Sequence, residues 1–487
     1  MHFRLMAQIL ALAAVILAAG MLVPSLLGLI WGEREAALAL ASGSAVGLLV
    51  AALLAIFGGV RPRNENLLHR EAFLAVTLTW LMACFVSGVP FWVSGHFGGF
   101  TSSMFEAFSG FTTTGATILA DIEAVPSSLL LWRAATQWLG GGGIVLLGVA
   151  ILPLIGVGGL ELYRKEVSGP TTTKLQPRVR ETARLLWRVY LLLTGAQILL
   201  LVIAGVGLFD AVSHALTTVS TGGFSTKNAS VAAFDDTIIE GIFIVFMLAG
   251  GTAFSLHFAA MARGPGVYLR DMEFKVYIAV VIGSMLLIAS ALWLNSIYDA
   301  TGSIRYALFQ VASIITSTGY ANADFEAWRA VHALPAFTLL VLMVSGGCAG
   351  STAGGVKIIR FWMALQQSAQ ELFRQIHPRA VTRLKLGGIA VPTVVQSSLM
   401  GFLMLYAMLF LLGSLALSLL GLDYVSATSA SVSALSNMGP ALGTLGPFDN
   451  YADLPAAGKW ILMVMMVVGR LEIYTVLVLL LPEYWRR

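Results

Sequence analysis

The chain of 487 residues is 58% hydrophobic and only 11% charged, whereas charged residues make up roughly 25% of an ordinary soluble domain. This composition excludes a water-soluble fold and indicates an integral membrane protein with almost no soluble domain. The net charge of +4 does not indicate a nucleic-acid-binding protein, because the basic residues lie in short segments between apolar stretches, where they set membrane orientation.

Ten apolar stretches are long enough to cross a bilayer, which takes about 20 residues each. They cover residues 5–31, 37–59, 71–95, 129–156, 184–208, 237–261, 276–297, 332–373, 391–420 and 458–481. The first stretch is longer than the apolar core of a typical signal peptide, and a second span follows it closely. We therefore expect an all-α membrane protein in which ten long helices span the bilayer.

Basic residues cluster in every second connection between these stretches. They are Arg61, Arg63 and Arg70; Arg164, Lys165, Lys174, Arg178, Arg180, Arg184 and Arg188; Arg263, Arg270 and Lys275; and Arg374, Arg379, Arg383 and Lys385. By the positive-inside rule these connections are cytoplasmic. Ten spans place both termini on the same side, which agrees with Arg4, Arg486 and Arg487 at the chain ends.

The opposite connections share one order of parts, a short and moderately apolar segment followed by a hydroxyl-rich cluster that ends in glycine. The clusters are Thr112, Thr113, Thr114 and Gly115; Val219, Ser220, Thr221 and Gly222; Thr316, Ser317, Thr318 and Gly319; and Ser436, Asn437, Met438 and Gly439. An interval of about 100 residues between the glycines indicates an internal repeat. Each unit is a span, a re-entrant hairpin and a second span.

This repeat predicts five segments along the chain. Two N-terminal helices occupy residues 1–62, and the four repeats occupy residues 63–170, 171–265, 266–378 and 379–487. Non-helical backbone at membrane depth is tolerated only where protein or a watery cavity satisfies its polar groups. The four clusters are therefore expected to meet around a common polar centre in a pseudo-fourfold arrangement.

The short segments before the clusters, residues 103–110, 211–218, 306–315 and 425–434, are expected to be pore helices. Their partly negative C-terminal ends would favour a cation at the centre, and the following carbonyl oxygens could replace its water shell, as in potassium filters. Glycine would permit positive φ and a close approach of the four backbones. No carboxylate lies within the clusters, which favours a large monovalent cation over calcium. The alternative is that they are ordinary helix caps and outer loops.

Residues 332–373 are too long for one straight span, and five glycines lie close together in their middle. These are Gly346, Gly347, Gly350, Gly354 and Gly355. Each glycine weakens a helix by about 1 kcal/mol relative to alanine, so we expect the helix to break there. The segment does not fit a nucleotide phosphate loop, because Lys357 falls one position too late and Ile358 follows it. A flexible packing kink is the alternative to a functional loop.

Arg470 lies in the middle of the last span, where a charge costs about 2.5–3.5 kcal/mol to insert. It must therefore face the protein interior. Glu472 is only two residues away and lies on another face of the helix, so it is not an expected partner. Arg470 is either a positive barrier in a cation path or a structural arginine bound to backbone carbonyls or to an acid on another helix.

With these motifs the sequence resembles the TrkH-like branch of the Trk/Ktr/HKT superfamily of potassium transporters. The likeness covers essentially the whole chain and depends on FTTTGAT (111–117), TTVSTGGFST (217–226), ITSTGY (315–320), ALSNMGPALG (434–443), GGCAGSTAGGVK (346–357), KLQPRVRETA (174–183) and GRLEIYT (469–475). Two extra N-terminal helices are typical of this branch. Members with serine at the position of Gly115 tend to admit sodium, so glycine in all four clusters favours potassium.

The resemblance implies a potassium-uptake protein of the bacterial cytoplasmic membrane, with potassium as the transported ion and no covalently bound cofactor. It further implies an intramembrane gating loop below the filter, made of Gly346, Gly347, Cys348, Ala349, Gly350, Ser351, Thr352, Ala353, Gly354, Gly355 and Lys357, with Arg470 as the pore barrier. The implied partners are a second copy of the chain and a cytoplasmic TrkA-like subunit that binds NAD(H) or ATP. Residues 161–188 and 374–388 are candidate docking segments, or simply solvated basic segments.

Two other function classes remain to be weighed. A cation-coupled secondary symporter of potassium would place its substrate at broken helices, but inverted repeats would support it and the four units here run in one orientation. An intramembrane protease would need a nucleophile and a base, and no GxSxG motif is present.

The two cysteines give no functional signal. Cys84 and Cys348 lie in apolar stretches and show neither a disulfide nor a metal-ligand pattern.

Overall fold

The computed structural model describes residues 2–59, 69–150, 175–380, 382–387 and 389–486, which are mostly helical. The α-helices are α1 (Phe3–Ile30), α2 (Arg34–Gly58), α3 (His69–Ser94), α4 (Phe100–Phe111), α5 (Ser127–Ala150), α8 (Leu175–Ile203), α9 (Leu208–Val219), α10 (Thr237–Gly250), α11 (Phe254–Arg263), α12 (Met272–Leu294), α13 (Ala300–Ile315), α14 (Phe325–Val331), α15 (Ala333–Ser345), α16 (Ile358–Ile376), α17 (Thr393–Leu419), α18 (Tyr424–Ser436), α19 (Ala456–Arg470), α20 (Tyr474–Leu477) and α21 (Pro482–Trp485). The shorter elements are the 3-10 helices η1 (Ser230–Phe234), η2 (Pro265–Val267), η3 (Gly443–Leu445) and η4 (Val478–Leu480), and an antiparallel pair of strands, β1 (Lys385–Leu386) and β2 (Ile389–Ala390). Six of the basic residues named above lie outside the described part of the chain: Arg61, Arg63, Arg164, Lys165, Lys174 and Arg487.

Six helices are long and apolar enough to cross a membrane, namely α1, α2, α3, α8, α12 and α17. Two bent pairs, α10 with α11 and α19 with α20, pass the same test together, so the described residues contain six to eight candidate spans. Large apolar side chains on the long helices, such as Leu12, Leu38 and Leu199, are 61–67% exposed. Apolar residues on the outer surface of a bundle are expected where that surface meets lipid. The protein is therefore a multi-span membrane protein.

The sequence predicts residues 237–261 as one unbroken span. This prediction is wrong, because the segment consists of two helices with a sharp bend between them. The chain turns by 100° between α10 and α11. α10 ends at Gly250 because the carbonyl oxygens of Gly250 and Gly251 accept hydrogen bonds from Thr352 and Cys348 instead of from the next helical turn. The bend is therefore produced by contacts with a segment about 100 residues away, which no local pattern reveals.

The last span is bent as well, by 107° between α19 and α20. Glu472 and Ile473 follow α19 with φ angles of 62° and 38°, a region that side-chain-bearing residues rarely adopt and that cannot continue a helix. In contrast, the predicted break in residues 332–373 is confirmed. α15 ends at Ser345 and α16 begins only at Ile358.

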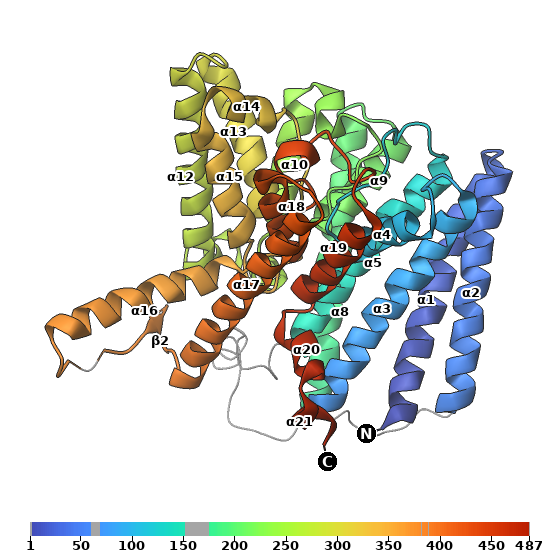
Figure 1. Cartoon of the computed structure of the whole chain (residues 1–487), viewed down its shortest axis with the longest axis horizontal. Helices are drawn as coiled ribbons and strands as arrows, with labels where there is room; N and C mark the ends of the chain where they lie inside the picture. Colours follow the sequence, from blue (N-terminus) through green and yellow to red (C-terminus); the bar gives the residue numbers. More distant parts are fainter. Residues whose placement is uncertain (1, 60–68, 151–174, 381, 388, 487) are drawn as a thin grey trace.

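Four short helices, α4, α9, α13 and α18, lie in the upper half of the bundle (Figure 1). α4, α9 and α18 each pack between the α-helices that precede and follow them in the chain, and α13 packs between α12 and α15. Each of the four contains the short helical segment predicted for its repeat. Asp299 and Asp423 cap the first turns of α13 and α18 through backbone N–H groups. Hydrogen bonding from Ser426 lowers the pKa of the Asp423 carboxyl at this exposed end.

Both termini lie at the opposite, lower end of the molecule (Figure 1). The C-terminal helix α21 is attached to the start of α3, since the Tyr484 hydroxyl donates to the carbonyl of Arg70 over 2.6 Å. α16 leaves the bundle at an angle to the long helices and extends away from it. The four short helices and the chain ends thus lie at opposite ends of the molecule.

Candidate functional site

Each of the four short helices ends in the same backbone conformation. The second residue after the last complete turn is left-handed, with φ of 53° at Thr113, Thr221, Ser317 and Asn437. The N–H of the next residue bonds to a carbonyl five residues earlier, in the pairs Thr114 to Ser109, Gly222 to Thr217, Thr318 to Ser313, and Met438 to Ser433, at 2.8–3.0 Å. The fourth residue is a glycine with positive φ, 86° at Gly115, 77° at Gly223, 83° at Gly319 and 98° at Gly439. We refer to these four segments, Thr112–Gly115, Ser220–Gly223, Thr316–Gly319 and Ser436–Gly439, as the glycine loops.

The second glycine loop differs by one residue from the alignment made on sequence. That alignment begins the cluster at Val219 and ends it at Gly222, but Val219 is the last residue of α9. Gly223, and not Gly222, takes the positive φ that Gly115 has in the first loop. The backbone conformation decides the register, because only a glycine accepts this φ without strain.

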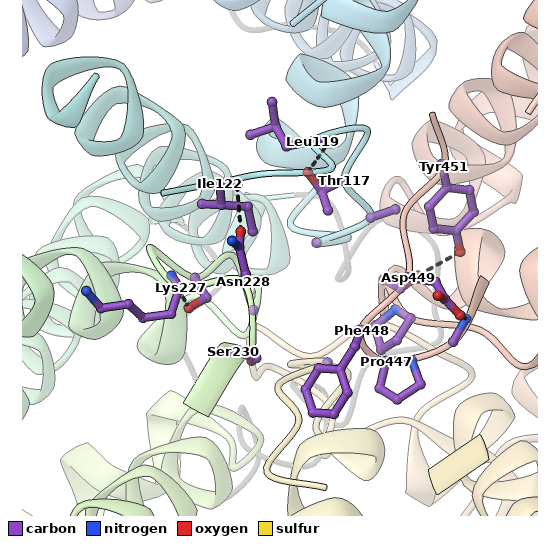
Figure 2. Close-up of a pocket in the computed structure, with 18 of the residues that line it drawn as sticks. Thr117, Leu119, Ile122, Lys227, Asn228, Ser230, Pro447, Phe448, Asp449 and Tyr451 are labelled. Carbon is purple, nitrogen blue, oxygen red and sulfur yellow. Dashed lines mark hydrogen bonds between the residues drawn. The ribbon is translucent and has the colours of Figure 1, made fainter. Parts of the chain in front are cut away.

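The four positive-φ glycines lie close to neighbouring loops in a ring, in which each loop contacts the next and the fourth contacts the first. A Cβ added to each glycine would press against the third carbonyl oxygen of another loop: Gly115 against Gly222, Gly223 against Thr318, Gly319 against Met438, and Gly439 against Thr114. All four glycines also line a single pocket. Figure 2 shows other residues of this pocket, with Lys227 and Asn228 on one side and Pro447, Phe448 and Tyr451 on the other.

The side chains of the glycine loops are buried in the protein, and most of their hydroxyls form hydrogen bonds there, whereas the Thr113 hydroxyl has no partner among the described residues. Thr112 is fully buried, and its hydroxyl donates to the Phe108 carbonyl over 2.7 Å and lies 2.8 Å from the Thr114 hydroxyl. Thr316 and Thr318 repeat this pair at 2.7 Å. Within the described residues, no donor reaches the carbonyl oxygens of Thr112, Thr113 and Thr114. These carbonyls remain available to a ligand.

A buried ion pair between α4 and α5 connects the chain segments that follow the first two glycine loops. Arg133 on α5 lies 2.6 Å from Glu106 on α4, and both side chains are at most 2% exposed. Glu106 also accepts from the N–H of Ile118, while Arg133 donates to the carbonyl of Ser225, both over 2.9 Å. The pair therefore ties together the chain segments that leave the first and second loops. The sequence analysis missed it, although a carboxylate within an apolar helical segment is a usable signal.

Residues 346–357 form no helix and lie against the C-terminal ends of the short helices. The Thr352 hydroxyl donates to the carbonyl of Val219 over 3.0 Å, and the Gly354 N–H donates to the Ser317 hydroxyl over 2.6 Å. A Cβ on Gly354 would press against the carbonyl of Ser436. All residues predicted for the gating loop lie in this segment, which contacts three of the four short helices at their ends.

Arg470 holds the same segment from the other side. It is 3% exposed, and its Nη1 donates to the carbonyl of Thr352 over 2.8 Å. Its Nε and Nη2 have no partner among the described residues. Glu472 pairs with Arg360 at 2.7 Å, which agrees with the expectation that it does not pair with Arg470. The arginine is bound to a backbone carbonyl, and that carbonyl belongs to segment 346–357.

A second contact of this segment was not foreseen. The N–H of Ala349 donates to Oε1 of Glu273 on α12 over 2.6 Å. The Lys357 ammonium donates to the carbonyl of Ala353 within the segment. A single glutamate in an apolar helix was the only signal in the sequence. No group of three or more His, Cys, Asp or Glu residues that could hold a metal ion occurs in the part of the chain that the structure describes.

Comparison with known proteins gives one family. Residues 50–486 match the TrkH family, described as "Cation transport protein". The chain is 40% identical over 493 residues to the Trk system potassium uptake protein TrkH of Salmonella typhimurium, with all of both chains covered. It is 33% identical to TrkG of Escherichia coli K12, with 86% of each chain covered. The crystal structure of the potassium transporter TrkH from Vibrio parahaemolyticus superimposes with a TM-score of 0.90 at 37% identity and full coverage of both chains.

Proposed function

The chain belongs to the TrkH family of cation transport proteins, and from this premise we propose that it takes up potassium through a selectivity filter built from its four glycine loops. One observation carries the proposal. Four positive-φ glycines, one in each loop, lie against carbonyl oxygens of other loops in a closed order and line one pocket. A cation in this place would meet backbone carbonyls from all four repeats.

The chemistry of the loops favours potassium. Four short helices end at the loops, so their partly negative C-termini favour a cation. The hydroxyls of the first and third residues of the first and third loops pair with each other within the protein, so the backbone carbonyl oxygens are the proposed ligands. Carbonyl rings can replace the water shell of a dehydrated monovalent ion, whereas a calcium site would use several carboxylates. The filter residues are Thr112–Gly115, Ser220–Gly223, Thr316–Gly319 and Ser436–Gly439.

The same repeat gives the proposed architecture. The bundle has pseudo-fourfold symmetry, and α5 and the broken pair α15–α16 complete a set of ten spans. Segment 346–357 is the gate below the filter, because it is bonded to the ends of α9 and α13. Arg470 places a positive charge beside this gate and forms a barrier to cations. The pocket is lined by the filter glycines but by no residue of segment 346–357 and not by Arg470, so in this proposal an ion entering from the pocket meets the filter first.

We further propose that both termini are cytoplasmic and that the protein resides in the inner membrane. The relatives are named as parts of a Trk system, which implies further subunits. A homodimer with a cytoplasmic TrkA-like subunit that binds NAD(H) or ATP is the assembly expected by analogy. Residues 374–388 are one candidate segment for its docking, and residues 374–379 of it, which include Arg374 and Arg379, are exposed. The other candidate segment, residues 161–188, begins outside the described residues.

Uptake of rubidium or potassium in a cell that lacks its own potassium uptake tests the function. Expression of this chain should restore uptake above the level of the empty vector. No uptake, with the protein shown to be in the membrane, would refute the proposal. Flux that requires a sodium or proton gradient after reconstitution would instead favour the coupled symporter.

A further inference from the structure

Gln137 is a buried residue of α5 whose side chain touches the second glycine loop. It is 0% exposed. Its Nε2 donates to the carbonyl of Gly222 over 2.7 Å, and its Oε1 accepts from the N–H of Phe224 over 3.1 Å. A carbonyl can only accept and an N–H can only donate, so the two partners fix the orientation of the amide. The side chain spans Gly223, the filter glycine of this loop.

The third residue of this loop is unlike its counterparts. Thr114 and Thr318 use their hydroxyls to pair with the first residue of the same loop, and Met438 fills this position in the fourth loop. Gly222 has no side chain, yet its own φ lies outside the left-handed range. The backbone there would accept a side chain without strain.

Gln137 explains why the position is a glycine. A Cβ on Gly222 would meet the amide of Gln137, with Nε2 only 2.8 Å away. Cβ atoms do not approach other heavy atoms this closely, so the glutamine occupies the space that a third-position side chain fills in the other loops. Gly223 is a different case, because its φ is 77° and its Cβ would press against the Thr318 carbonyl of the third loop.

We infer that Gln137 is a positioning residue of the filter, which replaces the missing side chain at position 222 and holds the second loop through both sides of Gly223. This inference rests on the proposed filter function. The Gly222 carbonyl that Gln137 binds is also the atom against which a side chain at Gly115 would press. Gln137 therefore sets the contact between the first and second loops. Selectivity among monovalent cations depends on such carbonyl positions.

The first test replaces the amide but keeps its volume. Gln137→Met removes both hydrogen bonds, and the potassium over sodium permeability ratio of the reconstituted full chain should fall roughly fivefold, the factor that corresponds to about one hydrogen bond. The matched control is Gln197→Met. Gln197 on α8 is also 0% exposed, but its amide has no partner among the described residues, so this variant should keep the wild-type ratio.

The second test uses the contact between Gln137 and Gly222. Gly222→Ala alone should lower the permeability ratio and the uptake rate at least fivefold, and Gln137→Ala in the same chain should recover most of the uptake because it vacates the space. Gly223→Ala should lower the ratio as strongly, and Gln137→Ala should not rescue it, because the obstacle there is the backbone of the third loop.

The outcomes separate this inference from the filter itself. Two results would overturn the role of Gln137 and leave the filter intact. The first is a wild-type permeability ratio for Gln137→Met. The second is that Gln137→Ala fails to rescue Gly222→Ala, although Gly223→Ala does impair selectivity. If Gly223→Ala also keeps the wild-type ratio in a correctly folded protein, the proposed filter fails. Equal elution profiles in detergent and equal thermal unfolding midpoints show that each variant is folded.

Discussion

Replacement of Arg470 by alanine should increase cation flux. The wild-type guanidinium holds segment 346–357 through one hydrogen bond of 2.8 Å to the carbonyl of Thr352, and a hydrogen bond from a charged group contributes about 1.5–3 kcal/mol. Its loss should shift the equilibrium of the proposed gate toward the displaced position by roughly 10- to 150-fold. Removal of the positive charge should also lower the proposed barrier to cations, so both effects have the same sign.

The fold should survive this change. Two of the three guanidinium nitrogens already lack a partner among the described residues, so alanine leaves no buried carboxylate unpaired, in contrast to the loss of one member of a buried ion pair. The assay is single-channel open probability, or rubidium flux, of the reconstituted chain. Arg329→Ala is the control, since it removes an arginine of α14 that is 41% exposed and pairs with Glu326, and it should leave flux unchanged. Equal or lower flux in folded Arg470→Ala would refute the reasoning and assign the residue a structural role.

Three other substitutions probe the filter, its support and the gate. Gly115→Ser should lower the potassium over sodium permeability ratio about tenfold. A φ of 86° disfavours any L side chain by about 1–2 kcal/mol, and the new Cβ would also press on the Gly222 carbonyl of the second loop. An unchanged permeability ratio would count against the filter. Glu106→Gln leaves Arg133 buried and charged without its carboxylate partner, so the free energy of unfolding should fall by about 3–5 kcal/mol. An unchanged thermal unfolding midpoint in detergent would show that the ion pair does not stabilise the fold. Gly354→Ala places a methyl group against the Ser436 carbonyl and should displace the proposed gate. Rubidium flux should then rise at least about fivefold. Unaltered flux would mean that this contact does not hold the proposed gate closed.

The sequence predicts the helical class, the four short helices and the break after Ser345 because each has a local cause, namely apolar length or a concentration of glycine. It does not predict the register of the second loop. Gly222 and Gly223 are adjacent, and composition cannot say which of them takes the positive φ of 77°. The bend after Gly250 and the roles of Gln137 and Glu273 depend on partners far away in the chain, and these partners become visible only when the helices are packed.

The contacts of segment 346–357 limit how firmly a gate can be closed. A gate that regulators can open must differ between its two positions by only a few kcal/mol, since shifting a population from 1:99 to 99:1 already takes about 5.5 kcal/mol. The bonds from Cys348, Thr352 and Gly354 to other elements are neutral and contribute about 1 kcal/mol each, much of which water or new partners can replace. The contacts to Glu273 and Arg470 are the ones made by ionisable side chains, and they come from α12 in the predicted third repeat and α19 in the predicted fourth repeat. In the proposed gate we therefore expect these two residues to hold the segment most firmly, so that a regulator that moves either α12 or α19 should release it without touching the proposed filter.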